Sequence, residues 1–188
     1  MLVSTPKSFA VVEPRLYRST VFSRENFSFI RLLKLRTVLY LSSEEAPKAL
    51  RDFCQDEEIT YINLGTTQPY SRSGDWSPLR GDLAKVALET VLDSSKLPLL
   101  IVCLSGVQQT GALVGCLRRL QGWSFTSTIE EHRRFCDVSS RSNVEHFIEV
   151  FDVDMVTLPK SLPEWFAADM AASIEEETNE RKKRGSSS

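Results

Sequence analysis

The sequence lacks the features of several large protein classes. It has no basic excess, since 23 Lys and Arg stand against 25 Asp and Glu among 188 residues. General nucleic-acid and membrane-surface binders need such an excess, so neither class is expected. No apolar run approaches the roughly 20 residues that span a bilayer. The first ten residues show no basic start followed by an apolar stretch, so we expect no secretory signal.

Cysteines are few and scattered. The four are Cys54, Cys103, Cys116 and Cys136. They form no CxxC pair, and no histidine stands at metal-binding spacing from them. We therefore expect no metal site and no cofactor, and a cytoplasmic protein with reduced thiols.

The composition that remains is that of an ordinary globular protein, with 41% hydrophobic and 26% charged residues. The length suits one domain with a short tail. We expect an N-terminal arm over residues 1–8, a domain over 9–157 and a partly disordered C-terminal tail over 158–188. The end of that tail is rich in charged residues and serine, which favours a solvated segment.

Short apolar runs rich in β-branched residues predict three buried strands, at 37–41, 59–64 and 97–103. A fourth, weaker strand includes Leu16 and Tyr17. The near-continuous hydrophobicity of these runs suits a parallel sheet that is covered on both faces.

Helical spacing of apolar residues predicts helices between and after the strands, at 44–58, 79–92 and 110–120. Ser23 fits the cap of a further helix. Ser127 and Ser142 each precede a glutamate by three residues, a capping-box pattern that predicts two more helices. The alternation predicts an α/β domain with a central, mostly parallel sheet flanked by helices.

The segment that carries chemistry follows the strand ending at Cys103. Its residues are Leu104, Ser105, Gly106, Val107, Gln108, Gln109, Thr110 and Gly111. A strand, short loop and helix in this order point backbone N–H groups and the positive end of a helix dipole at one spot, which binds phosphate. A cysteine at that spot can act as a nucleophile. A cysteine that ends a core strand is more often a packing residue, so the residues alone leave both interpretations open.

The same segment resembles the signature loop of the protein tyrosine phosphatases, His-Cys-x5-Arg-Thr/Ser-Gly, with Cys103, Thr110 and Gly111 in register. Flanking segments resemble the plant and fungal atypical dual-specificity phosphatases, which include the yeast oxidant-induced cell-cycle arrest proteins. These segments are PRLYRS at 14–19, ENFSF at 25–29, LRTVLYL at 35–41, GALVGCLRRL at 111–120, EHRRF at 131–135 and EHFIEVFD at 145–152. The resemblance, which runs from about Phe9 to Asp152, implies a compact dual-specificity phosphatase fold.

Two positions depart from the family pattern. Gln109 stands where the family has its loop arginine, and Val102 stands where it has a histidine. The arginine pairs bidentately with phosphoryl oxygens, whereas an amide has neither the charge nor the fork. The histidine supports ionisation of the cysteine in the family, and a valine contributes only bulk. Both changes predict impaired catalysis by Cys103.

The general acid is a further departure. The resemblance places the family's aspartate near Gly81, so Asp82 is the candidate, with Asp75 as an alternative. A carboxylate at a junction between loop and helix is more often a helix cap.

The resemblance and its departures together predict a pseudophosphatase that acts as a scaffold or regulatory subunit in a complex with active or inactive relatives. Two alternatives stay open: a slow or specialised cysteine-dependent phosphatase acting on a phosphoprotein or an inositol pyrophosphate, and an anion or redox sensor that uses Cys103. The loop backbone also predicts weak binding of phosphate or a polyanion. Basic residues that could assist are Arg72, Arg80, Arg118, Arg133 and Arg134.

Overall fold

A computed structural model describes residues 3–65, 77–136 and 141–171. Its strands are β1 (Ala10–Glu13), β2 (Leu16–Thr20), β3 (Thr37–Tyr40), β4 (Thr60–Asn63) and β5 (Leu99–Cys103). They form one sheet in the order β1-β2-β5-β3-β4, in which every neighbouring pair is parallel except β1 and β2. The predicted α/β class and mostly parallel sheet are confirmed. The antiparallel edge strand β1 was not predicted.

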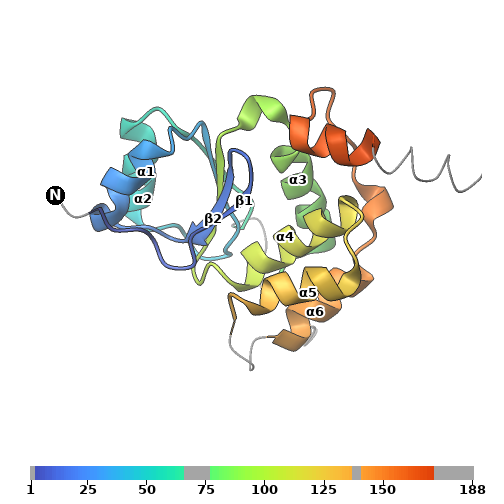
Figure 1. The fold of residues 1–188 in the computed structure, drawn as a ribbon. Helices are drawn as coiled ribbons and strands as arrows, with labels where there is room; N and C mark the ends of the chain where they lie inside the picture. Colours follow the sequence, from blue (N-terminus) through green and yellow to red (C-terminus); the bar gives the residue numbers. More distant parts are fainter. Residues whose placement is uncertain (1–2, 66–76, 137–140, 172–188) are drawn as a thin grey trace, which may run out of the picture.

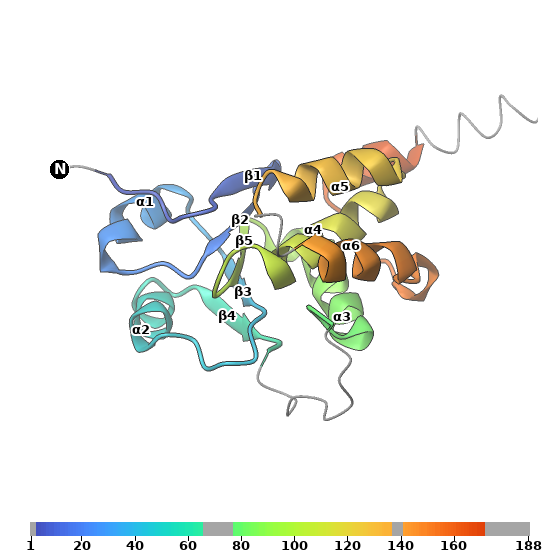
Figure 2. The same ribbon diagram turned by 90° about the horizontal axis from the view of Figure 1, so that it is seen from below.

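Helices cover both faces of this sheet, as Figures 1 and 2 show. On one side lie α1 (Phe27–Leu32) and α2 (Lys48–Asp56), and on the other lie α3 (Gly81–Val91), α4 (Gln108–Leu120), α5 (Phe125–Arg133) and α6 (Arg141–Val150). Short 3-10 helices include η1 (Arg24–Asn26), η2 (Ser94–Lys96) and η4 (Val153–Met155). Within the described ranges, no helix is both long and apolar enough to cross a membrane.

Helix starts show where local patterns fail. Ser23 caps η1, which leads into α1, as predicted. The cap of α5 is Ser124, whose Oγ accepts the N–H of Ser127 at 3.2 Å, so the predicted cap at Ser127 is wrong. Ser142 lies inside α6, which begins at Arg141, so its predicted cap is wrong too. In α5 the earlier serine takes the cap because it directly follows the turn that ends α4.

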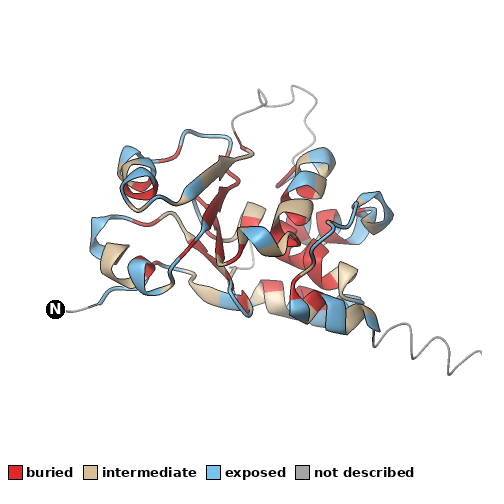
Figure 3. Cartoon of the chain, turned by 90° about the horizontal axis from the view of Figure 1, so that it is seen from above, coloured by how far each residue is buried: buried red, intermediate tan, exposed pale blue. Residues whose placement is uncertain are grey.

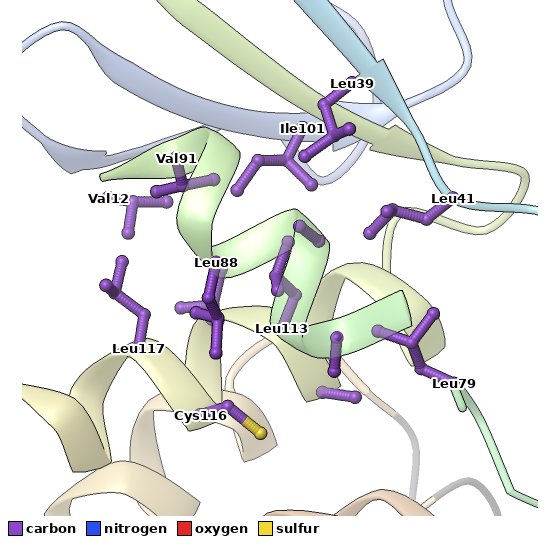
Figure 4. Packing of buried hydrophobic residues seen from close by; sticks show 14 of the residues in the cluster. Val12, Leu39, Leu41, Leu79, Leu88, Val91, Ile101, Leu113, Cys116 and Leu117 are labelled. Carbon is purple, nitrogen blue, oxygen red and sulfur yellow. The ribbon is translucent and has the colours of Figure 1, made fainter. Parts of the chain in front are cut away.

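Two hydrophobic clusters fill the space between the sheet and its helices. Successive side chains of a strand point to opposite faces. Ile101 and Cys103 therefore join the cluster under α3 and α4, whereas Leu100 and Val102 join the cluster under α1 and α2. Figure 4 shows the first cluster, and Figure 3 shows burial concentrated in the sheet and the inner faces of the helices. The alternation places the side chain of Cys103 on the α4 side of the sheet.

The chain continues to pack onto the core beyond residue 157, the predicted end of the domain. A helix spans 164–171 and inserts Phe166, which is 2% exposed, into the cluster under α3 and α4. Trp165 and Met170 pack against the same cluster. The first part of the predicted tail thus contributes to the core, and residues 172–188 lie outside the described ranges.

Candidate active-site loop

The Cys103 loop, residues 103–111, lies at the carboxyl end of the parallel strands. It links β5 to α4 and contacts the ends of both neighbouring strands. The N–H of Leu104 donates to Ser42 Oγ at 2.8 Å, just beyond β3. Gly106 has a φ of +66°, and a Cβ there would lie 2.6 Å from the backbone nitrogen of Thr20 at the end of β2. Only glycine allows the loop to lie so close to β2 in this conformation.

Cys103 lies beneath the loop. The residue is 0% exposed, like the rest of its buried strand, and its Sγ is 3.8 Å from Ser105 Oγ. Its carbonyl accepts the N–H of Val21 at 3.0 Å, which fixes the end of β5 against the segment that follows β2. The predicted nucleophile therefore occupies the expected position between strand and loop, but bulk solvent does not reach it in this conformation.

Four backbone N–H groups of the loop, those of Leu104, Gly106, Val107 and Gln108, have acceptors within the protein. The N–H groups of Val107 and Gln108 donate to Ser105 Oγ at 3.2 and 3.4 Å. The N–H of Gly106 donates to the carbonyl of Cys103 at 3.2 Å, and that of Leu104 to Ser42. A phosphate nest is a set of backbone N–H groups that converge on one point and donate hydrogen bonds to a bound anion. Here the Ser105 hydroxyl already accepts two of these N–H groups, so a ligand would have to compete with one of the loop's own side chains.

The loop itself carries no positive charge. Residues 103–111 include no basic side chain, and Gln109 lies half-buried in the first turn of α4. Val102 is fully buried on the other face of the sheet, where it pairs in register with Tyr40 of β3. The two positions that depart from the family pattern therefore lie on opposite faces of the sheet: Val102 faces α1 and α2, and Gln109 belongs to α4 on the other face.

A buried cation lies directly behind the loop, and no prediction from the sequence included it. Arg18 of β2 is 1% exposed, donates from Nη2 to the carbonyl of Gly106 at 2.8 Å, and stacks 3.9 Å above the centre of the Phe135 ring. Burial lowers the pKa of Arg18 to about 10, and Coulomb attraction to Cys103 and Glu131 opposes this shift. Arg18 therefore stays charged at neutral pH. The sequence did contain a signal for this buried cation: in the PRLYRS segment an arginine stands next to the residues predicted as a strand.

The geometry does not favour Asp82 as the general acid. Asp82 lies in the first turn of α3, mostly exposed, and accepts two hydrogen bonds from Arg80 at 2.9 and 2.6 Å. These bonds hold the pKa of the Asp82 carboxyl below its usual range. A general acid must instead keep its proton near neutral pH. Asp75, the alternative, lies outside the described residues.

The basic residues expected to assist anion binding are mostly engaged elsewhere. Arg118 is buried and bonds to Glu13, Glu131 and the carbonyl of Val12. Arg133 pairs with Glu130 and Glu145, and Arg80 pairs with Asp82. Arg134 is exposed at the end of α5, and Arg72 lies outside the described residues. Of these arginines, three are therefore held in ion pairs with carboxylates of the protein.

Gly111 allows α5 to support the start of α4. A Cβ at Gly111 would lie 2.5 Å from Nδ1 of His132, which is buried near the end of α5. The Nε2 atom of the same histidine lies 3.5 Å from the Sγ of Cys136. The glycine predicted as part of a phosphate loop therefore also permits close packing behind it. No sequence pattern indicated His132 as its neighbour.

Comparisons with known proteins match this fold and loop. A family model described as the tyrosine phosphatase family matches residues 3–169. OCA1 of Debaryomyces hansenii, named as a tyrosine-protein phosphatase, is 40% identical over 164 residues, which is 85% of this chain and 84% of OCA1. DG1060 of Dictyostelium discoideum, also named as one, is 36% identical over 160 residues, which is 85% of this chain and 94% of DG1060.

Solved structures agree with these relatives. The core catalytic domain of the PP-IP phosphatase SIW14 from S. cerevisiae, in complex with citrate, has 36% identity and a TM-score of 0.73. The similarity covers 81% of this chain and 90% of that domain. TpbA of P. aeruginosa has a TM-score of 0.63 at 19% identity, which shows the shared fold alone.

Proposed function

Since the chain belongs to the tyrosine phosphatase family, we propose that it is a catalytically impaired member that acts as a scaffold or regulatory subunit with relatives of the same family. The observation that supports impaired catalysis is the charge and hydrogen bonding of the Cys103 loop. Gln109 is neutral, and the Ser105 hydroxyl accepts the N–H groups of Val107 and Gln108. A phosphoryl group entering the loop must displace that hydroxyl and finds no guanidinium within residues 103–111.

The missing guanidinium is expected to dominate the loss of activity. Phosphoryl transfer spreads negative charge over three equatorial oxygens, and a supplied arginine is worth roughly 10³–10⁵ in rate at other phosphoryl-transfer sites. A glutamine amide has no charge and cannot form the bidentate fork. Asp82, ionised by its pairing with Arg80, adds no proton donor for the leaving group. The loop therefore lacks the charge that catalysis needs, and the candidate acid that the structure describes is unsuited to its role.

A role in a complex requires exposed contact surface. Trp123 and Phe125, in and just after the turn between α4 and α5, are 41% and 47% exposed. Aromatic side chains are enriched in protein interfaces relative to the rest of a protein surface. A pull-down with the full chain as bait is expected to recover phosphatase relatives. Recovery of no relative would count strongly against the scaffold role.

Restoration of the family residues tests the impairment. We expect measurable hydrolysis of a phosphotyrosine analogue only in the double variant Val102→His with Gln109→Arg, and none in the wild type. The variant carrying Cys103→Ser as well is the matched control, since it keeps both restored residues but has no thiol nucleophile. Rapid turnover by the wild type would refute the proposal. An inert double variant would show that the loop has also lost its acid or its shape.

A second candidate is a slow or specialised phosphatase, and the similarity to SIW14 favours it. SIW14 is named as a PP-IP phosphatase, so an inositol pyrophosphate is the substrate to try first. Turnover that disappears in Cys103→Ser would establish this function. The third possibility, oxidation of Cys103 in a sensor, is disfavoured because the residue is buried.

A further inference from the structure

Two buried arginines, Arg18 and Arg118, differ in how their charge is balanced. Arg118 forms ion pairs with the carboxylates of Glu13 and Glu131, so its charge is balanced by direct contacts. Arg18 takes part in no ion pair among the described residues, and its Nε has no hydrogen-bond acceptor there. Among the described residues it donates to a neutral carbonyl and stacks on an aromatic ring, and Glu131 attracts it without forming an ion pair with it. A positive charge therefore remains behind the loop, separated from solvent.

The hydrogen bond from Arg18 also sets the orientation of a peptide group in the loop. Its acceptor is the carbonyl of Gly106, at 2.8 Å from Nη2. In a trans peptide, the carbonyl and the N–H of the next residue point in opposite directions. With the Gly106 carbonyl turned toward Arg18, the Val107 N–H points away from it, toward Ser105 Oγ at 3.2 Å. The direction of this N–H thus depends on a side chain 88 residues earlier in the chain.

We propose that Arg18 is the positioning residue of the Cys103 loop: it orients the Gly106–Val107 peptide and supplies from behind the positive charge that Gln109 does not supply within the loop. This inference rests on the proposed function in one respect, namely that the loop does not hydrolyse phosphate; that the loop still attracts an oxyanion is part of the inference itself. Arg18 is too deeply buried to touch a ligand, so it acts through the peptide and through space.

Tungstate, a phosphate-like oxyanion, is a suitable probe. Its binding to the full chain can be monitored through the backbone amide resonances in NMR spectra. In Arg18→Gln we expect a displaced Val107 amide resonance before any tungstate is added, and about tenfold weaker tungstate binding from the loss of a nearby charge. Arg18→Lys keeps the charge and is expected to regain most of the affinity. The matched control is Arg15→Gln, since Arg15 donates a similar 2.8 Å bond to a carbonyl, that of Leu97, at the opposite end of the sheet.

The outcomes separate this inference from the proposed function. Equal affinities and unmoved Val107 resonances in Arg18→Gln and Arg15→Gln would overturn the positioning role, whatever the phosphatase assay shows. A wild type that binds no tungstate at millimolar concentration would overturn the charge role. If Arg18→Gln does not fold, a tungstate titration of the wild type provides the test. The proposal requires that the Arg18 Nε–H resonance shift together with the Val107 amide resonance. An unmoved Arg18 signal would overturn the proposal.

Discussion

Replacing Ser105 by alanine is expected to open the Cys103 loop to anions. The Ser105 hydroxyl accepts the N–H groups of Val107 and Gln108, at 3.2 and 3.4 Å. An incoming oxyanion has to displace this hydroxyl before it can accept the same two bonds. Alanine removes the competitor and leaves both N–H groups at the start of α4, where the helix dipole already favours negative charge.

The size of the effect follows from the two bonds. A neutral hydrogen bond contributes a net stabilisation of about 0.5–1.5 kcal/mol, and both bonds are longer than the usual optimum. We therefore take about 1–2 kcal/mol for the pair, which corresponds to about 5- to 30-fold tighter tungstate binding in Ser105→Ala. The same substitution removes two hydrogen bonds at the start of α4, so the free energy of unfolding should fall by about 1 kcal/mol.

Isothermal titration with tungstate and urea denaturation measure the two effects together. The matched control is Ser124→Ala, because Ser124 caps α5 through a similar 3.2 Å bond from Ser127 and lies in a different helix. This control should lose comparable stability without any change in tungstate affinity. Unchanged or weaker tungstate binding in Ser105→Ala would refute the view that the hydroxyl competes with a ligand for the loop's N–H groups.

Two further predictions concern the core. Phe166→Ala should lower the free energy of unfolding by about 3–5 kcal/mol because Phe166 is buried. The control Phe125→Ala, on the surface, should change it by less than about 0.5 kcal/mol, and urea denaturation measures both. Equal small losses would show that helix 164–171 is not part of the core. Burial raises the pKa of the Cys54 and Cys116 thiols from an ordinary 9.0 to about 12. Between these values the unfolded chain loses thiol protons that the folded chain retains, so stability should fall as pH rises through this window. Urea unfolding at about pH 8 and about pH 10 measures the fall, and Cys54→Ala should reduce it; an equal fall in both proteins would contradict the assignment to Cys54.

The local parts of this fold and site follow from the sequence. A run of five apolar residues ending at Cys103, then a short loop and an apolar helix, predicts β5, the Cys103 loop and α4. The absence of a guanidinium at Gln109 can be read from a single position. Such features depend on residues within one stretch of chain, where hydrophobic spacing and helix dipoles act.

The contacts that close and support the loop could not be predicted in this way. The partner of the Gly106 carbonyl lies 88 residues away, and the Ser42 hydroxyl that binds the Leu104 N–H lies 62 residues away. These contacts form only because β2 and β3 flank β5 in the sheet, an order that hydrophobic patterns do not specify. The role of Ser105 was missed for a different reason. A serine two residues after the cysteine is equally compatible with an open nest, and only the backbone conformation aims its hydroxyl at Val107 and Gln108.

The position of Arg18 suggests why the loop could bind an oxyanion without accelerating its hydrolysis. A loop arginine in front of the phosphoryl group forms bonds that strengthen as charge develops on the equatorial oxygens, and such bonds raise turnover. Arg18 is buried behind the loop and reaches a ligand only through space. Because Arg18 forms no bond to the equatorial oxygens, we expect its attraction to differ little between bound phosphate and the transition state. Uniform binding of this kind lowers the dissociation constant and leaves the chemical step unchanged, because catalysis depends on the difference between the two states.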